Sequence, residues 1–125
     1  MNDKKNVLRD KSFTFAVRTV NLYKYIIANK AEYVLSKQLL RSGTSIGANV
    51  REAQNAESRA DFIHKLGIAQ KETDETLYWL ELLTETDFLS EPEFVSMQND
   101  ATELMKIIRS IILTVKTNKN SVNNS

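Results

Sequence analysis

The chain has 125 residues and a formal net charge of +1, which is enough length for one domain with its own core. It contains no cysteine, and this excludes disulfides and thiolate metal sites. Its apolar runs are far shorter than a membrane span, and its charged N-terminus lacks the apolar stretch of a secretory signal. We therefore expect a cytoplasmic protein with no membrane partner.

Charge is distributed unevenly along the chain. Residues 1–30 contain seven Lys or Arg against two Asp or Glu, whereas residues 58–90 contain three against seven. A basic first helix and an acidic third helix can attract each other within one bundle, which is the simpler interpretation. The same asymmetry also suits a contact between the first helix of one subunit and the third helix of the next.

Helical periodicity begins in the first quarter of the chain. Apolar residues recur every three or four positions from about Asp10 or Ser12 to Asn29. After a short turn, a second helix is expected from roughly Glu32 to Ala56. The apolar face of the first helix is predicted to comprise Phe13, Ala16, Val17, Val20, Tyr23 and Ile27, broadened by Phe15, Leu22 and Ile26.

Two capping patterns mark the starts of the remaining helices. Ser58 with Asp61 predicts the N-cap of a third helix that ends near Glu85. Ser90 with Glu93 forms a capping box for a fourth helix, with a proline in its first turn. The heptad positions of the fourth helix are Phe94, Met97, Ala101, Leu104, Ile108, Ile111 and Val115.

Four long helices joined by short turns predict an all-α fold, an antiparallel up-down-up-down four-helix bundle. We expect the fourth helix to fray near residues 116–118, so that one domain spans residues 1–118. The remaining residues, 119–125, have no apolar anchor and are predicted to form a disordered tail.

The segment Arg41–Glu52, RSGTSIGANVRE, is unusual for a bundle helix because it places two glycines among small polar residues. Wound as a helix, it puts polar side chains in one narrow stripe beside an apolar face. Gly43 and Gly47 lie one turn apart and form a notch where another backbone can come close. The segment therefore indicates both a polar seam and a close packing contact.

Antiparallel geometry gives the seam its expected partners. Arg41 should lie level with Asp74 and Glu75 of the third helix. A half-buried amide such as that of Asn49 must also find a partner, so Asn49→Ala should lower the free energy of unfolding by roughly 1–3 kcal/mol. We assign a structural role to Arg41, Ser45, Asn49, Glu52 and Glu75.

The pattern R-x-x-x-S-I-x-x-N-x-x-E in this segment resembles the signature of the 23S rRNA intervening-sequence proteins, a family of small bacterial four-helix bundles. The resemblance spans about Ser12 to Val115 and implies the bundle fold and a homopentamer. Proteins similar to this family include the accessory variability protein of diversity-generating retroelements, a pentameric bundle that engages a reverse transcriptase and nucleic acid. The matching positions are Arg41, Ser45, Ile46, Asn49 and Glu52, followed by Ser58, Phe62, Leu66, Ala69 and Glu75.

A second apolar stripe on the third helix indicates an interaction surface. Tyr78 and Trp79 lie on it, although neighbouring leucines already serve the bundle core. A wide core face is the alternative, but aromatic residues are enriched at the centres of interfaces. We expect an oligomer interface at Gly43, Gly47, Tyr78 and Trp79, with further copies of the chain as partners.

Few side chains suggest catalysis or metal binding. His64 follows Asp61 by three positions, but one such pair falls short of the ligand set of a di-metal bundle. Glu72 and Glu75 have no nucleophile beside them, and the glycines belong to no phosphate loop. We therefore expect no catalytic residue, metal, cofactor or small-molecule substrate. The main hypothesis is a non-enzymatic oligomeric four-helix bundle that acts as a binding or scaffold protein.

The alternative hypothesis is an RNA- or DNA-binding accessory protein that uses a basic N-terminal segment. A ring of subunits would repeat the charge of this segment around an axis. Binding driven by phosphates would then fall steeply with added salt. Another protein remains a candidate partner as well. The nucleic-acid-binding candidates are Lys4, Lys5, Arg9 and Lys11.

Overall fold

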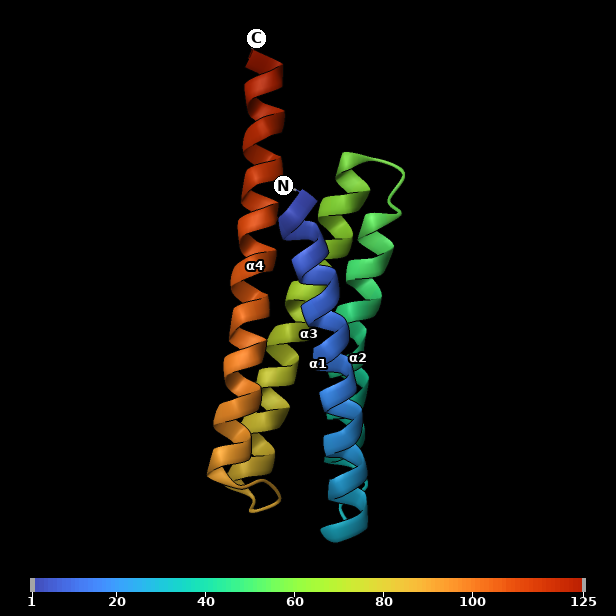
Figure 1. Cartoon of the computed structure of the whole chain (residues 1–125), viewed down its shortest axis with the longest axis vertical. Coiled ribbons are helices and arrows are strands. Elements are labelled where there is room, and N and C mark those ends of the chain that lie inside the picture. The colour runs from blue at the N-terminus through green and yellow to red at the C-terminus, as the bar shows by residue number, and fades with distance from the viewer. Residues whose placement is uncertain (1, 125) are drawn as a thin grey trace.

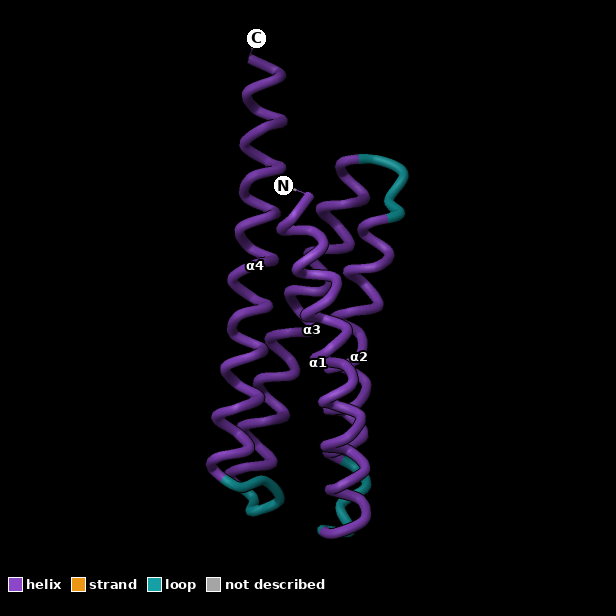
Figure 2. Tube along the Cα trace, in the orientation of Figure 1, coloured by secondary structure: helices purple, strands orange, loops and turns teal. Residues whose placement is uncertain are grey.

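Four long α-helices make up the computed structural model, and short connections join them at the two ends of an elongated molecule (Figure 1). The structure describes residues 2–124, and it describes the side chains of residues 3–118. Helices and connections account for all of the described chain, which contains no strand (Figure 2). The helices are α1 (Asn2–Asn29), α2 (Leu35–Gln54), α3 (Arg59–Glu85) and α4 (Glu91–Asn124).

Successive helices run in opposite directions, so the predicted antiparallel up-down-up-down bundle is confirmed. Contacts join α1 to α2, α2 to α3, α3 to α4, and α4 back to α1, and the last contact is the sparsest. The start of α1, the α2–α3 connection and the final turns of α4 share one end of the molecule, which we call the upper end (Figure 1). None of the helices within residues 2–124 combines the length and the apolar character needed to span a membrane.

The hydrophobic core runs along the bundle and is built from residues at heptad spacing. The predicted heptad of α4 is confirmed, because its five central residues are buried and Phe94 and Val115 pack against the core from its two ends. Helices α2 and α3 contribute large side chains with almost no exposure, namely Leu39, Ile46, Val50, Leu66, Leu80 and Leu83.

The buried face of α1 is rotated from the one we predicted. Phe13 and Val17, expected in the core, are 58% and 45% exposed. Ser12 and Thr19 are buried instead, and their hydroxyls donate to carbonyls of their own helix at 3.1 and 2.8 Å. A hydroxyl that bonds its own helix can be buried without an unpaired group, so apolar character alone placed the centre of the face wrongly. The prediction is confirmed for Phe15 and Ile26. The buried residues of α1 are Leu8, Ser12, Phe15, Thr19 and Ile26.

Small side chains allow α1 and α2 to pack closely. A Cβ atom on Gly43 would lie 2.6 Å from the Thr19 Cγ2 atom, and one on Gly47 would lie 3.2 Å from the backbone oxygen of Ser12. The notch on α2 therefore receives α1 of the same chain. The structure thus gives Gly43 and Gly47 a packing role within one chain, and their expected part in an interface between chains stays a prediction.

Helix α1 begins at Asn2, about two to three turns before the predicted start at Asp10 or Ser12. The additional turns are held by the rest of the bundle, because Leu8 is buried in the core. The side-chain amide of Gln54 on α2 also donates to the backbone oxygen of Lys5 at 3.1 Å. Because these turns contain many charged residues, apolar periodicity did not predict that they pack against the bundle.

Helix α2 begins at Leu35 because Glu32, which we expected inside the helix, caps it. The Glu32 carboxylate accepts hydrogen bonds from the backbone N–H groups of Val34 at 3.1 Å, Leu35 at 2.8 Å and Ser36 at 2.7 Å. Burial alone would raise the pKa of Glu32, but these bonds together lower it. Ala31 has a φ of 52°, a left-handed conformation that separates α1 from this cap.

The starts of α3 and α4 are as predicted. Ser58 Oγ accepts from the Asp61 backbone N–H at 3.0 Å. At the start of α4, Ser90 Oγ accepts from the Glu93 N–H at 3.3 Å, and Glu93 Oε1 accepts from the Ser90 N–H at 3.2 Å. These two bonds are those of a capping box.

The end of α4 differs from our expectation. The helix continues to Asn124, beyond the frayed end expected near residues 116–118. We predicted that residues 119–125 are disordered. The side chains of these residues lie outside the described range, so their disorder stays a prediction.

Candidate functional site

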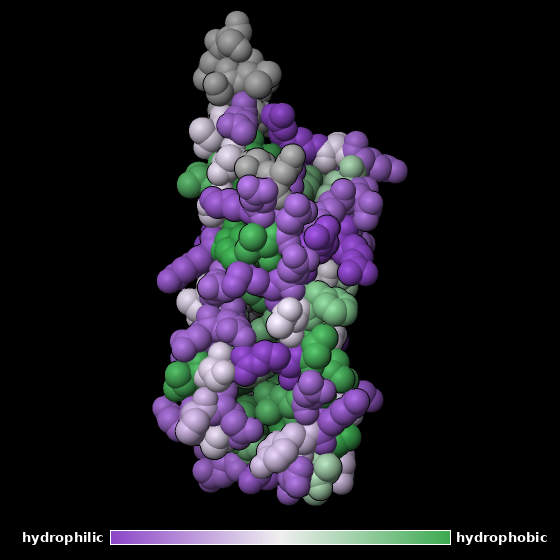
Figure 3. Space-filling view, in the orientation of Figure 1, coloured by the Kyte–Doolittle hydropathy of each residue, from purple (hydrophilic) through white to green (hydrophobic). Residues whose placement is uncertain are grey.

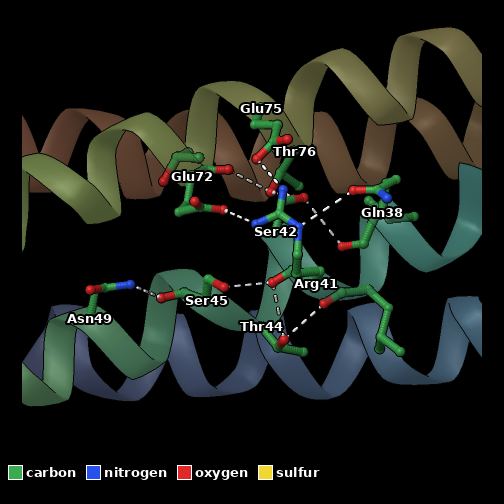
Figure 4. A network of polar contacts seen from close by, with 12 residues as sticks. Gln38, Arg41, Ser42, Thr44, Ser45, Asn49, Glu72, Glu75 and Thr76 are labelled. Carbon is green, nitrogen blue, oxygen red and sulfur yellow. Dashed lines mark hydrogen bonds and ion pairs between the residues drawn. The ribbon is translucent and has the colours of Figure 1, made fainter.

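A polar network joins α2 and α3 along the predicted seam (Figure 4). Arg41 forms ion pairs with Glu75 and with Glu72, and Arg41 Nη1 lies 3.2 Å from Glu72 Oε2. Gln38 Oε1 accepts a weaker bond from Arg41 Nε at 3.4 Å. The hydrogen bond from Arg41 holds the pKa of Glu75 below its usual value. The structure thus contains the expected pairing with Glu75, and Glu72 takes the place that we expected for Asp74.

Small side chains extend this network in two ways. Thr76 Oγ1 and Ser42 Oγ are both buried and lie 3.0 Å apart, which links α3 to α2 inside the core. Ser45 and Asn49, by contrast, bond only their own helix in the described structure. Ser45 Oγ donates to the Arg41 backbone oxygen at 2.7 Å, and Asn49 Nδ2 donates to the Ser45 backbone oxygen at 2.8 Å. Arg41 and Ser42 therefore bond α3 in this part of the seam, whereas Ser45 and Asn49 do not.

The last predicted seam residue, Glu52, provides a second link near the upper end. Its Oε1 atom lies 3.2 Å from Nζ of Lys65 on α3. Exposed ion pairs contribute at most about 1 kcal/mol each to stability. We conclude that the pairs of Arg41 and Glu52 mainly fix how α2 and α3 are aligned.

Tyr78 and Trp79 are adjacent on α3 but differ in exposure. Tyr78 is 55% exposed, whereas Trp79 is half-buried and packs against the core. Their rings meet edge to face, with centroids 4.9 Å apart. The Trp79 N–H group lies close enough to Glu75 to lower the pKa of that carboxylate further. Its geometry falls short of a hydrogen bond, so Trp79 Nε1 is buried without a partner among the described residues. Tyr78 is therefore the side chain available for an outside contact, and Trp79 supports it.

A groove between α1 and α2 borders the exposed apolar face of α1. We call it the α1–α2 groove, and its volume is about 430 Å³. Phe13 lies on its wall, and Val17 follows one helical turn away. Figure 3 shows apolar patches between polar side chains on the face that α1 crosses. The lining residues are Arg9, Phe13, Ala16, Thr44, Gly47, Ala48, Arg51 and Glu52.

Two of the four predicted nucleic-acid-binding residues are paired with carboxylates. Lys11 Nζ lies 2.6 Å from Glu103 Oε1, and this hydrogen bond raises the pKa of Lys11. Arg9 Nε lies 3.2 Å from Asp10 Oδ1. The basic character of the N-terminal segment is thus partly neutralised within the chain.

The other two candidates, Lys4 and Lys5, have no ion pair among the described side chains. Lys4 donates to the hydroxyl of Ser110 on α4. Lys5 lies over the ring of Phe62, with its Nζ atom 4.6 Å from the ring centroid. Lys5 also lines a cleft of about 780 Å³ at the upper end, which we call the upper-end cleft.

Metal-ligating residues do not gather in the part of the chain with described side chains. No three His, Cys, Asp or Glu residues lie close enough there to hold an ion. Asp61 caps α3, and its Oδ2 atom also accepts from the Glu57 backbone N–H at 3.3 Å. His64 is exposed on the same helix.

Sequence reasoning missed the α1–α2 groove and the upper-end cleft. Admitting Ser12 and Thr19 to the core would have turned α1 to its observed orientation and left Phe13 and Val17 outside. The sequence has no comparable pattern that predicts the upper-end cleft, because its lining residues come from the start, middle and end of the chain.

The fold and these contacts define a class of protein, a small antiparallel four-helix bundle with an arginine–carboxylate link between its second and third helices. Residues 4–110 match the 23S rRNA-intervening sequence protein family, and the chain belongs to that family. A crystal structure of a protein of unknown function from the S23 ribosomal protein family of Bacteroides thetaiotaomicron VPI-5482 is similar, with 59% sequence identity and a TM-score of 0.87. The match covers 87% of this chain and 97% of that one. No curated protein matches the chain significantly, and neither match indicates a catalytic family.

Proposed function

We propose that this protein assembles into a homo-oligomer and acts by binding, as a scaffold, rather than by catalysis. The observation that carries the proposal is the exposed apolar face of α1. Phe13 and Val17 are about half exposed beside the α1–α2 groove, although the core is filled without them. Apolar surface gathered in this way is typical of an interaction site.

Charge complementarity favours a second copy of the chain as the occupant of the groove. On α3, the exposed Tyr78 lies one helical turn from Asp74 and close to Glu81, and both carboxylates are exposed. The groove carries Arg9, Arg51 and Glu52 in its lining. Arg9 is paired with Asp10 and Glu52 with Lys65, whereas the exposed Arg51 has no ion pair among the described side chains. An aromatic ring beside acids thus fits an apolar groove that offers the cation of Arg51.

The two surfaces lie on different helices, so the proposed contact is heterologous. Such contacts repeat from one subunit to the next until a ring closes. Phe13 and Val17 on α1 and Tyr78 on α3 are all exposed, which leaves both surfaces available to neighbouring copies. The resemblance given above implies five subunits, and a pentamer is the assembly that we propose.

Light scattering on the full chain at micromolar concentration tests this proposal. The measured mass should be a multiple of the 14.3 kDa chain mass. Phe13→Ser should lower the measured mass without changing the helical content, because it removes apolar contact area. Val95→Ser, which alters an exposed valine on α4, is the matched control and should leave the mass unchanged. A monomeric wild-type chain would contradict the proposal, as would equal dissociation of both variants.

Nucleic-acid binding is a second candidate function, and the unpaired charge at the upper end favours it. Lys4 and Lys5 lie there without carboxylate partners among the described side chains. A titration with structured RNA should show binding that falls steeply as salt is added. Lys4→Gln combined with Lys5→Gln should weaken this binding. Absence of binding at low salt would exclude the candidate.

A further inference from the structure

The upper-end cleft combines positive charge with an apolar floor within one chain. Its volume of about 780 Å³ lies in the range of small-molecule sites. The start of α1, the α2–α3 connection, the start of α3 and the later turns of α4 all contribute to its lining. Its charged lining residues are Lys5 and Arg59, and no carboxylate lines it among the described residues.

The two positive charges of the cleft are not neutralised by the described side chains. Neither Lys5 nor Arg59 takes part in an ion pair there. The contact between Lys5 and the Phe62 ring holds the ammonium group inside the cleft rather than extended into solvent. Arg59 adds a guanidinium, whose forked donors suit the oxygens of a phosphate. Two cations without a carboxylate favour a doubly charged anion such as a phosphate monoester.

The remaining lining indicates what the phosphate would be attached to. Phe62 and Val115 supply apolar surface, and Asn6 supplies an amide that can both donate and accept. Gln54 is also present, and its carbonyl oxygen stays available because only its N–H group bonds Lys5. Apolar contact together with amide groups is the chemistry that recognises a planar nitrogen heterocycle.

We propose that the upper-end cleft binds a nucleoside 5′-phosphate, with Lys5 and Arg59 on the phosphate, and with Val115 and the part of the Phe62 ring that Lys5 leaves uncovered against the base. The site lies within one chain, so it does not depend on the proposed assembly. This proposal specifies, for the second candidate function of nucleic-acid binding, which cleft binds and which chemical group it recognises. The same group occurs in a free mononucleotide and at the 5′ end of an RNA strand.

Calorimetric titration of the full chain at low salt tests the site with two pairs of ligands. One pair is AMP and adenosine, and the other is a short RNA with and without a 5′ phosphate. In at least one pair, the phosphorylated ligand should bind more than about tenfold more tightly. Arg59→Gln and Lys5→Gln should each weaken that binding by about tenfold. Lys71→Gln, at an exposed lysine of α3, should leave it unchanged.

Circular dichroism should show the same helical content for all variants, so that a loss of binding reflects the cleft. Binding of AMP would identify a free nucleotide as the ligand, and binding restricted to the phosphorylated RNA would identify a strand end. Absence of binding to both phosphorylated ligands would overturn the proposal. The proposal would also be overturned if the affinity for RNA were the same with and without the 5′ phosphate and in both cleft variants. That result would leave the second candidate function in place. AMP binding without salt-dependent RNA binding would support the cleft and exclude that candidate.

Discussion

At Gly43, the absence of a side chain determines how closely α1 and α2 approach. Gly43→Ala should lower the free energy of unfolding by about 1–2 kcal/mol, because the added methyl group would overlap Thr19. Thr19 cannot move aside easily, since it is buried and its hydroxyl bonds the Phe15 backbone oxygen at 2.8 Å. Urea unfolding followed by circular dichroism measures the change.

Gly67 provides the matched control on α3. A Cβ atom there would meet nothing within 4 Å. Gly67→Ala should therefore raise the free energy of unfolding by roughly 0.5–1 kcal/mol, because alanine favours a helix interior. If both substitutions stabilise the protein, the close contact between α1 and α2 is not a constraint.

The contacts of Asn49 change the expectation for its removal. Among the described residues, its amide bonds only the Ser45 backbone oxygen of its own helix. Asn49→Ala should thus lower the free energy of unfolding by less than about 1 kcal/mol, since the lost bond is partly offset by the helix propensity of alanine. A loss of 2 kcal/mol or more in urea unfolding would show that the amide has a partner on another helix.

Among the helices, α2 depends most clearly on a single side chain for its start. Glu32→Ala should lower the free energy of unfolding at neutral pH by about 1–2 kcal/mol, as loss of a helix cap does. The folded-state pKa of Glu32 is lowered, so its contribution is present above the unfolded-state pKa near pH 4 and is lost as the pH falls through the folded-state value. The difference between wild type and variant should therefore shrink in acid.

Urea unfolding at neutral pH and at about pH 2 measures this difference, with Glu57→Ala as the control. Glu57 is an exposed glutamate in the α2–α3 connection. Its removal should have little effect at either pH. A Glu32→Ala difference that stays constant or grows in acid would contradict the capping role.

The sequence predicted most of the secondary structure because caps and heptads are local. The starts of α3 and α4 follow from Ser58 and Ser90 with the acids three positions later, and both are as expected. Glu32 misled the prediction because a glutamate can extend a helix or cap it, and only the backbone of Ala31 distinguishes the two roles. The pairing of Arg41 with Glu75 could be predicted from the sequence, because the antiparallel register of α2 and α3 fixes the position of each residue along the bundle axis. The buried face of α1 was predicted only in part, because its centre holds the polar residues Ser12 and Thr19, whose hydroxyls bond their own helix.

At the scale of the whole molecule, the proposed assembly depends on two surfaces. The α1–α2 groove combines Phe13 with arginines, and the outer face of α3 combines Tyr78 with acids. The seam of Arg41 serves this arrangement indirectly, because it aligns the helix that carries Tyr78 with the helix that forms one wall of the groove.

Crosslinking between two different variants tests this arrangement most directly. The chain has no cysteine, so Arg51→Cys and Asp74→Cys would each introduce one reactive site beside the two aromatic residues. Treatment with a short bis-maleimide should join the two variants when they are mixed, and it should join neither variant to itself. Crosslinks within each variant alone, or none in the mixture, would contradict a contact between the α1–α2 groove of one subunit and α3 of the next.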